Sequence, residues 1–361
     1  MFLVTGGTGF IGGHLLGKLR ARGIPVRCLG RLQARGMAGG PARGMAGGPA
    51  HDMTDGPAMG PARGSAQGHP RPSSLSVAIP ADVEMAQADW ATGQGIEAAL
   101  DGVDTVIHLA GVTKALAPAD YYTGNARATE TLARLLAGRP IRFVHVSSLA
   151  ALGPSPDGEP LAEDATPCPV SHYGKSKLEA ERMVAHWRPD AVIVRPPVVY
   201  GPRDTGVFQI LKSIAGGVVL EISGGERWFS AIYVEDLAEG LMAAAEAPQA
   251  AGRTYFLAHP KVVSWSELAA VAARIMSRRP RVVRIPPAVA RAAGYCAELW
   301  SHVTRKPGIL SRDKVAEACC RAWTCDSRRA ARELGFEAST PLETGLARTL
   351  AWYKEAGWIS Y

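Results

Sequence analysis

Short apolar runs alternate along this chain with stretches of helical periodicity. The runs that favour β-strands cover residues 2–5, 25–29, 83–88, 104–109, 141–146, 191–194 and 254–258. Apolar positions recur with helical spacing over residues 14–22, 95–100 and 119–137. Strands that alternate with helices are typical of a parallel sheet covered by helices on both faces. The pattern therefore predicts an α/β protein built on a doubly wound parallel sheet.

The first apolar run leads into a glycine-rich turn. Gly7, Gly9 and Gly12 have the spacing G-x-G-x-x-G, and they lie between the first predicted strand and the first predicted helix. Glycines in this context let backbone amides and the helix N-terminus approach a pyrophosphate. A flexible glycine loop is the alternative, but the order of strand, turn and helix favours the dinucleotide site of a Rossmann domain.

The end of the second strand bears on the choice of cofactor. A site selective for NAD places Asp or Glu here, against the adenosine ribose. This chain has Arg31 instead, and its first acidic residue is Asp52. A guanidinium suits a phosphate, so Arg31 predicts a contact with the 2′-phosphate of NADP(H), although an ordinary solvated arginine is the alternative. We expect NADP(H) to be preferred, with NAD(H) as the second choice.

A segment of biased composition follows. The eight residues from Ala34 to Pro41 recur letter for letter from Ala42 to Pro49, within a Gly- and Pro-rich stretch at residues 34–76. Such a segment lacks the apolar periodicity needed to bury a core. We expect a disordered insert beside the adenosine end of the cofactor, with no catalytic role. A mobile flap or a tether for a partner is the alternative.

A tyrosine and a lysine one helical turn apart indicate acid/base chemistry. Tyr173 and Lys177 would lie on the same face of a helix. A fixed cation lowers a tyrosine pKa from its ordinary value of about 10, so the pair can work as a general acid and base. Ser148 precedes Tyr173 by 25 residues, after the fifth predicted strand. Alone, such a pair is more often a packing arrangement. The residues around it must therefore show whether the pair is catalytic.

That context resembles a known family. The matching pieces are residues 5–12, Asp89, residues 108–111, Asn125, Ser147 and Ser148, residues 173–177, residues 195–202 and residues 233–237. They occur in the family's order across residues 1 to about 247. The chain resembles the extended short-chain dehydrogenase/reductases, the NAD-dependent epimerase/dehydratase superfamily. Its second half is most similar to the 3β-hydroxysteroid dehydrogenase and dihydroflavonol reductase branch.

The resemblance implies roles for individual residues. Tyr173 would be the acid/base, Lys177 would hold the nicotinamide ribose and lower the tyrosine pKa, and Ser148 would hydrogen-bond the reacting oxygen. Asn125 would support the proton network. The implied cofactor contacts are Gly6, Gly7, Gly9, Phe10, Ile11, Gly12, Arg31, Asp89, Trp90, Leu109, Ala110, Gly111, Tyr173, Lys177, Pro196 and Val198. We expect His108 to be a packed or capping histidine, since no metal-type cluster accompanies it.

Departures from the family pattern bear on the substrate. Val198 occupies the position of an asparagine in nucleotide-sugar epimerases, and residues 228–231 replace the segment that usually carries an arginine for the sugar diphosphate; Arg227 is out of step. A diphosphate needs cationic or amide donors, whereas an apolar lining suits an apolar ligand. We expect interconversion of an alcohol and a ketone on a bulky, hydroxysteroid-like substrate. The alternatives are a nucleotide-sugar epimerase or dehydratase with tightly bound NAD, and a non-catalytic cofactor-sensing or assembly protein.

The return of a strand at residues 254–258 divides the predicted chain into two parts. The Rossmann domain would comprise residues 1–202 and 232–258, and a smaller C-terminal substrate-binding lobe would comprise residues 203–231 and 259–361. In the lobe, an apolar segment at 288–300 is flanked by Arg278, Arg279, Arg281, Arg284 and Arg291. This segment is expected to be a helix packed on the lobe, a pocket lid or a helix that contacts a membrane surface.

Composition narrows the remaining choices. The 361 residues are 47% apolar, which suffices for one large domain with a smaller lobe. The net charge of +7 suits an anionic cofactor without requiring nucleic acid. The six cysteines form no C-x-x-C pair and no secretory signal is visible, so we expect free thiols in the cytoplasm. No run approaches the roughly 18 apolar residues of a membrane span, and the resemblance gives slight support for a homodimer.

Overall fold

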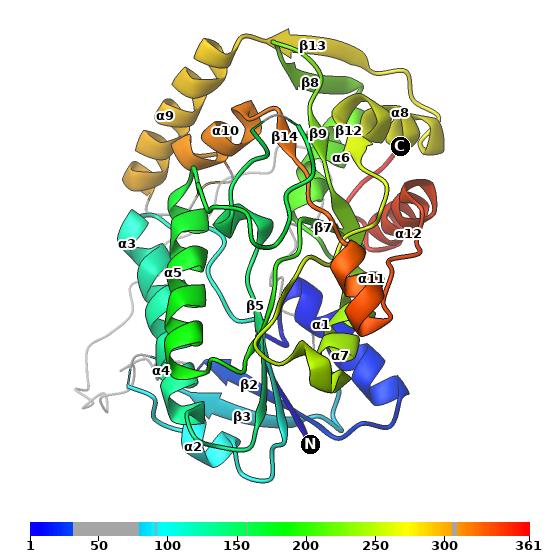
Figure 1. The fold of residues 1–361 in the computed structure, drawn as a ribbon. Helices are drawn as coiled ribbons and strands as arrows, with labels where there is room; N and C mark the ends of the chain where they lie inside the picture. Colours follow the sequence, from blue (N-terminus) through cyan, green and yellow to red (C-terminus); the bar gives the residue numbers. More distant parts are fainter. Residues whose placement is uncertain (32–78, 91, 157, 305–307, 309) are drawn as a thin grey trace, which may run out of the picture.

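The computed structural model describes residues 1–31, 79–90, 92–156, 158–304, 308 and 310–361. The insert expected at 34–76 falls outside these residues. Within them, a seven-stranded sheet forms the centre of the molecule, and a second group of helices and short strands lies beyond one edge of it (Figure 1).

Every pairing in the central sheet is parallel. Its strands are β1 (Phe2–Thr5), β2 (Val26–Arg31), β3 (Glu84–Ala88), β4 (Thr105–His108), β5 (Arg142–Val146), β6 (Val192–Val194) and β11 (Thr254–Tyr255). They lie in the order β11-β6-β5-β4-β1-β2-β3, and Phe2 pairs with Val26 on one side and with Thr105 on the other. The strand order therefore reverses between β1 and β4, where an open α/β sheet binds its ligands. The predicted doubly wound sheet is confirmed.

Helices cover both faces of this sheet because alternate strand residues point to opposite sides. In β5, Val144 joins a core cluster with residues of α1 (Phe10–Ala21) and α7 (Val234–Glu246). Phe143 joins a second cluster with residues of α2 (Ile96–Ala99), α4 (Ala128–Leu136) and α5 (His172–Trp187). Figure 1 shows α4 and α5 on one side of the sheet and α1 and α7 on the other.

The long helix expected at 119–137 contains one irregular turn. α3 (Pro118–Tyr121) runs into a π-helical turn, η1 (Tyr122–Arg127), and then into α4. Single π-turns inside α-helices are rare and often lie at functional sites. Here the wide turn contains Asn125, whose side chain is buried.

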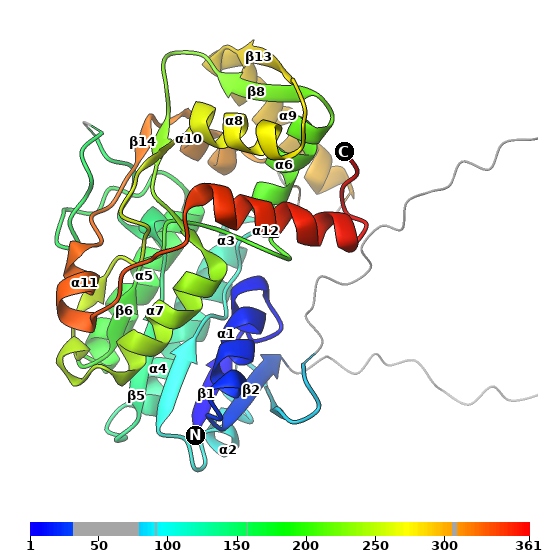
Figure 2. The ribbon, with the colours of Figure 1, turned by 90° about the vertical axis from the view of Figure 1, so that its right-hand side faces the viewer.

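A third core cluster lies beyond the sheet edge. It joins α6 (Gly206–Ala215), α8 (Trp265–Ile275) and α12 (Leu342–Glu355), and Figure 2 shows α12 crossing this region. Short strands complete it: β7 (Val198–Tyr200) with β10 (Ala231–Tyr233), β9 (Trp228–Phe229) between β12 (Val263–Ser264) and β14 (Ala322–Trp323), and β8 (Val218–Ile222) with β13 (Arg281–Ile285). The division into two domains stays a prediction. One element assigned to the lobe, α11 (Arg328–Leu334), packs through Ala330 on the first cluster of the sheet.

Two helices from the C-terminal third pack on each other. α9 (Pro287–Thr304) contacts α10 (Arg312–Cys319), and a Cβ on Gly294 would lie 2.8 Å from Cγ2 of Val315. Glycine at this position lets the two helices approach closely. We call these helices the α9–α10 unit. No helix in the described part of the chain is long and apolar enough to cross a membrane.

Candidate active site

The parallel sheet brings most of the predicted site residues to one edge. The glycine turn follows β1, residues 109–111 follow β4, Ser148 follows β5 and Pro196 follows β6. The carboxyl ends of parallel strands all lie at the same edge, which is where α/β proteins bind ligands. Tyr173 and Lys177 lie in the first two turns of α5.

The glycine turn packs at backbone contact and leaves a helix start uncapped. Gly6 has a φ of +73°, and a Cβ there would lie 2.8 Å from the amide nitrogen of Ala110. A Cβ on Gly12 would lie 2.2 Å from the carbonyl oxygen of Gly6. Gly9 begins α1 without a side-chain cap from the described residues, and the first turn of α1 has no acidic residue. Its free amides suit a pyrophosphate, so the turn fits the predicted dinucleotide.

A buried hydrogen-bond chain holds the loop after β4. Thr5 Oγ1 lies 2.7 Å from Nδ1 of His108 and accepts from the amide of Ala110 at 3.1 Å. Nε2 of His108 lies 2.9 Å from Oγ1 of Thr129. Burial lowers the pKa of His108 to about 3, so the ring is neutral. His108 is the packed histidine expected from the sequence, and it positions the loop instead of reacting.

Asn125 fixes the next part of the same loop. Its Oδ1 accepts from the amide of Val112 at 2.6 Å, and its Nδ2 donates to the Val112 carbonyl at 3.0 Å. Nδ2 also lies 2.9 Å from Oγ of Ser176, which donates to the carbonyl of Tyr173 at 2.7 Å. Asn125 therefore joins the loop after β4 to the first turn of α5. The structure gives it a positioning role beside the proton network that the resemblance implies.

Ser148 and Tyr173 meet as the sequence predicts. The Ser148 side chain caps η2 (Leu149–Ala151), where it accepts from the amide of Ala150 at 3.1 Å, and it is also hydrogen-bonded to the side chain of Tyr173. The expected lowering of the tyrosine pKa is wrong for this structure. Burial raises the pKa of Tyr173, while the cation of Lys314 and the hydrogen bond from Ser148 act in the opposite direction.

Lys177 is a buried cation facing the loop after β4. It is 5% exposed, and its Nζ donates to the carbonyl of Val146 at 2.7 Å. A Cβ on Gly111 would lie 3.9 Å from this Nζ. Burial lowers the pKa of Lys177 to about 8, with Glu181 acting in the opposite direction. The remaining N–H groups suit the ribose hydroxyls that the resemblance assigns to it.

Sequence reasoning missed a set of residues on α10. Asp313 accepts from the amide of His172, the first residue of α5, at 2.6 Å. Glu317 accepts from Oγ of Ser171, which caps α5, at 2.6 Å. Nζ of Lys314 lies 5.2 Å from the ring centroid of Tyr173 and 2.8 Å from Oε2 of Glu317. Nothing in the sequence spacing connects residues 313–317 with residues 171–173, because the contact forms only when the folded chain brings α10 back to the start of α5.

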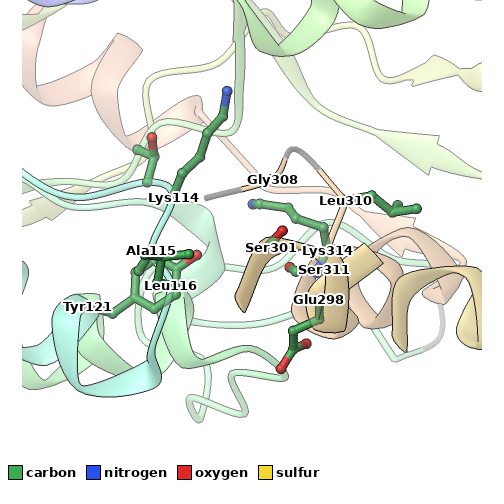
Figure 3. A pocket seen from close by; sticks show the side chains of 11 residues that line it. Lys114, Ala115, Leu116, Tyr121, Glu298, Ser301, Gly308, Leu310, Ser311 and Lys314 are labelled. Carbon is green, nitrogen blue, oxygen red and sulfur yellow. The ribbon is translucent and has the colours of Figure 1, made fainter. Parts of the chain in front are cut away.

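A small pocket lies between these residues and the segment after β4. Tyr121, whose ring centroid is 6.1 Å from that of Tyr173, forms one wall with residues 113–116. Lys314, Glu298 and residues of the turn between α9 and α10 form the other wall (Figure 3). The enclosed volume is about 20 Å³, which is room for a water molecule. The lining is mixed, with lysines, hydroxyls and apolar side chains.

The other predicted cofactor contacts have varied surroundings. Arg31 ends β2, and its backbone pairs with Ala88 just before Asp89. The backbone of Asp89 closes a tight turn with Gly93 and Gln94. The ring of Trp90 packs 5.7 Å from that of His108, so in this structure Trp90 supports the core.

The carbonyl of Pro196 accepts from the amide of Leu149 at 2.9 Å, and Val198 opens β7 with a partly exposed side chain. Phe10 and Ile11 begin α1 half-buried.

Arg227, the cation nearest to the expected diphosphate position, is engaged elsewhere. Its guanidinium donates to the backbone carbonyls of Ala318 at 3.0 Å, of Gly225 at 3.1 Å, of Ser223 at 3.4 Å and of Ile222. Four of the five N–H donors of this guanidinium are therefore engaged, so a bidentate contact with a phosphate would require breaking some of these bonds. Arg227 therefore holds the turn before β9.

A glycine turn at the switch point of a parallel sheet, with a Tyr–Lys pair beside it, defines the class of short-chain dehydrogenase/reductase folds. The chain belongs to the NAD dependent epimerase/dehydratase family, whose model matches residues 2–258. The predicted family is confirmed.

Relatives with curated names act on different substrates. A ceramide reductase of Caulobacter vibrioides is 30% identical over 278 residues, which cover 77% of this chain and 83% of the relative. A 4-hydroxy-2-methyl-3-oxo-4-farnesyl-3,4-dihydroquinoline-1-oxide ketoreductase of Stigmatella aurantiaca is 27% identical and covers 95% of this chain and 93% of its own. An N-acetyl-alpha-D-glucosaminyl-diphospho-ditrans,octacis-undecaprenol 4-epimerase of Escherichia coli O157:H7 is 28% identical over 71% of this chain and 80% of its own.

Solved structures agree on the fold. The UDP-glucuronic acid 4-epimerase of Bacillus cereus in complex with NAD superposes with a TM-score of 0.72, at 18% identity, over 99% of both chains. The UDP-glucose 4-epimerase of Thermotoga maritima gives a TM-score of 0.71 at 19% identity, over 98% of this chain and 99% of its own.

Proposed function

We propose that this protein is an NADP(H)-preferring oxidoreductase that reduces a ketone to an alcohol on a bulky apolar substrate. The observation that carries the proposal is the arrangement of three side chains: Ser148 hydrogen-bonded to Tyr173, with Lys177 one helical turn further along α5. A bound nicotinamide would supply or accept the hydride. The side chains of this protein would orient the reacting carbonyl and supply its proton.

The protonation state of Tyr173 is compatible with the reductive direction. Because burial raises this pKa, the phenol is protonated at neutral pH and can donate its proton to a ketone oxygen that gains negative charge. Ser148 would donate a hydrogen bond to the same oxygen. Lys177, fixed by the carbonyl of Val146, would hold the sugar next to the reacting ring and keep it in register with Tyr173.

The surroundings of the site support an apolar or amphiphilic substrate. Arg227 is occupied by backbone carbonyls, and Val198 replaces an amide side chain. Two of the relatives described above are named as a ceramide reductase and as the ketoreductase of a farnesyl-bearing compound. The pocket beside Tyr173 encloses only about 20 Å³, so we expect the α9–α10 unit to shift when a substrate of this size enters.

The cofactor preference has a separate test. Arg31→Ala should weaken NADPH binding much more than NADH binding, because only NADPH carries the 2′-phosphate that a guanidinium would contact. Both affinities can be measured by the quenching of protein fluorescence. Equal losses for the two cofactors would remove the NADP assignment and leave an NAD site.

A sugar epimerase that uses tightly held NAD is the second candidate. The undecaprenol-linked sugar epimerase described above supports it, as do Lys114 and Lys314 in the lining of the pocket. The two candidates differ in whether cofactor is consumed. A non-catalytic cofactor-binding role is the remaining alternative, and the connected Ser148, Tyr173 and Lys177 argue against it.

The experiment that separates them follows the absorbance of the nicotinamide band. Purified protein with NADPH is offered 3-ketosteroids, long-chain aliphatic ketones and UDP-sugars in separate reactions. Stoichiometric loss of NADPH with an apolar ketone is the expected result. Conversion of a sugar without net change of cofactor would establish the epimerase, and cofactor binding with no conversion of any class would contradict catalysis on these substrates.

A further inference from the structure

One face of α9 carries exposed apolar side chains that belong to no core cluster of the described residues. The stripe consists of Val289, Ala292, Cys296, Leu299, Trp300 and Val303, and all six are exposed. Their spacing of three and four residues places them on one side of the helix. The opposite side contains the buried Gly294 and contacts α10. The unit therefore packs through one face of α9 and leaves the apolar face open.

The exposure of this stripe is large for such side chains. Leu299 is 51% exposed, Trp300 69% and Val303 77%. Single exposed apolar residues are common on proteins, but a continuous stripe of them marks a surface that binds something. The ribbon that precedes α9 has exposed apolar side chains of its own, since Val283 of β13 pairs with Leu220 of β8 and both side chains are exposed. Figure 1 shows β13 and α9 together at the end of the molecule opposite the N-terminus.

Exposed arginines lie at the start of the ribbon strand that precedes α9 and on α9 itself. Arg278, Arg279 and Arg281 precede or begin β13, and Arg291 lies on α9; all four are exposed. Within the described residues none of these four forms an ion pair, whereas Arg284 lies 3.5 Å from Glu221 and Glu298 pairs with Arg312 at 2.8 Å. The charge that faces outward here is therefore cationic. Tyr295, beside the stripe, adds a second exposed aromatic side chain of the kind that favours the bilayer interface.

We propose that this surface docks on an anionic lipid bilayer, with α9 lying in the plane of the interface. An in-plane helix buries an apolar face while arginines nearby contact lipid phosphates. The other side of α9 reaches the candidate active site, because Ser301, seven residues after Gly294, and Leu310 line the pocket beside Tyr173. Docking would hold the α9–α10 unit, whose other side lines the pocket, at a membrane, where a long-chain substrate resides. That purpose rests on the proposed function, but the docking surface itself does not.

A second copy of this chain fits the surface less well. In a two-fold dimer the same patch meets itself, so the cationic surface of one copy would approach the cationic surface of the other. Like charges brought together in this way oppose association. A bilayer containing anionic lipid has the complementary charge and needs no matching shape.

Sedimentation with lipid vesicles tests the proposal without substrate or cofactor. Wild-type protein should pellet with vesicles of phosphatidylcholine mixed with phosphatidylglycerol, and only weakly with vesicles of phosphatidylcholine alone. The double variant Leu299→Ser, Trp300→Ser should lower the partition coefficient by about tenfold or more, since two large side chains leave the bilayer. Met85→Ser is the matched control, because Met85 is 46% exposed on the edge strand β3.

The outcomes separate docking from catalysis and from self-association. Unchanged vesicle binding by the double variant would overturn the proposal, and Val303→Ser serves as a second variant if the first is unfolded. Absence of wild-type binding, together with a dimer that only the double variant disrupts in sedimentation equilibrium, would assign the stripe to a second copy. Turnover on detergent-dispersed substrate should be the same in the double variant and the wild type. Loss of all turnover in both, with vesicle binding intact, would overturn the proposed function alone.

Discussion

The two walls around Tyr173 are built in different ways. The first wall comes from the strand ends of the sheet and is joined by short hydrogen bonds through buried groups, such as Asn125 with Val112 and Lys177 with Val146. The second wall is the α9–α10 unit, which reaches α5 through Asp313, Glu317 and Lys314. Its outer face is exposed to solvent.

The two walls differ in rigidity, and this difference suits them to different roles. Buried hydrogen-bond networks are rigid and hold one geometry, which suits the groups that transfer a proton. A helix pair with few buried side chains and charged contacts has lower local stability, which suits a wall that must admit a large substrate. We infer that the sheet edge positions the groups that transfer the proton and that the α9–α10 unit determines which substrates can reach them.

The largest expected effect lies in the first wall. Tyr173→Phe should lower turnover by about 100- to 10,000-fold, because it removes the general acid. Binding of NADPH should be nearly unchanged, which fluorescence quenching will show. Tyr122→Phe is the matched control, since its hydroxyl contacts only His172 among the described residues. Turnover that survives in the Tyr173 variant would place the proton donor elsewhere.

The stability of the protein should depend on pH because the pKa of Lys177 is lowered by burial. Its pKa is about 8 in the folded protein and about 10.4 in an unfolded chain. The unfolded chain therefore binds more protons between these values, and stability should rise with pH across that window by about 3 kcal/mol in total. Lys177→Met should remove this rise relative to the wild type. Urea unfolding at several pH values checks it, and parallel curves for the two proteins would contradict the buried cation.

A smaller effect is expected in the second wall. Lys314 opposes the raised pKa of Tyr173, so Lys314→Met should raise that pKa further and move the alkaline limb of the pH–rate profile upward. The substrate KM should also increase, by about tenfold, because the pocket loses a donor. Lys212→Met is the control, since Lys212 of α6 stacks on Phe208 in a similar way and does not line the pocket. A profile identical to that of the wild type would mean that the α9–α10 unit does not act on the tyrosine.

The smallest expected effect concerns the hydrogen bonds between α10 and the start of α5, which join the two walls. We call these contacts the joint. Asp313→Ala removes the carboxylate that accepts from the first amide of α5, and it should cost about 1 kcal/mol of unfolding free energy. Asp101→Ala changes an exposed carboxylate of the α2–β4 turn and should be neutral. Thermal unfolding followed by circular dichroism measures both. Equal melting temperatures would show that the joint adds nothing to stability.

The sequence predicted the first wall far better than the second. Gly7, Gly12, Ser148, Tyr173 and Lys177 follow strands or lie one helical turn apart, so local spacing and a family pattern locate them. The tyrosine pKa was predicted in the wrong direction because burial, which depends on the whole fold, exceeds the effect of nearby cations. Residues 313–317 carry no local signal, because their partners lie about 140 positions earlier.

The α9 segment shows where periodicity stops being informative. Its apolar spacing predicts an amphipathic helix whether the apolar face is packed or open. Only the folded chain shows that Gly294, on the opposite side, faces α10 while Trp300 and Val303 stay exposed. The pattern therefore gave the helix but not what it binds.

Deuteride transfer tests most directly whether this protein reduces an apolar ketone with Tyr173 as the proton donor. NADPH deuterated at the transferable position is mixed with the protein and an apolar ketone from the absorbance assay, and the product is analysed by mass spectrometry. We expect deuterium on the new carbinol carbon with the wild type and at most a trace with Tyr173→Phe over the same time. An unlabelled product, or equal labelling by both proteins, would contradict reduction with Tyr173 as the proton donor.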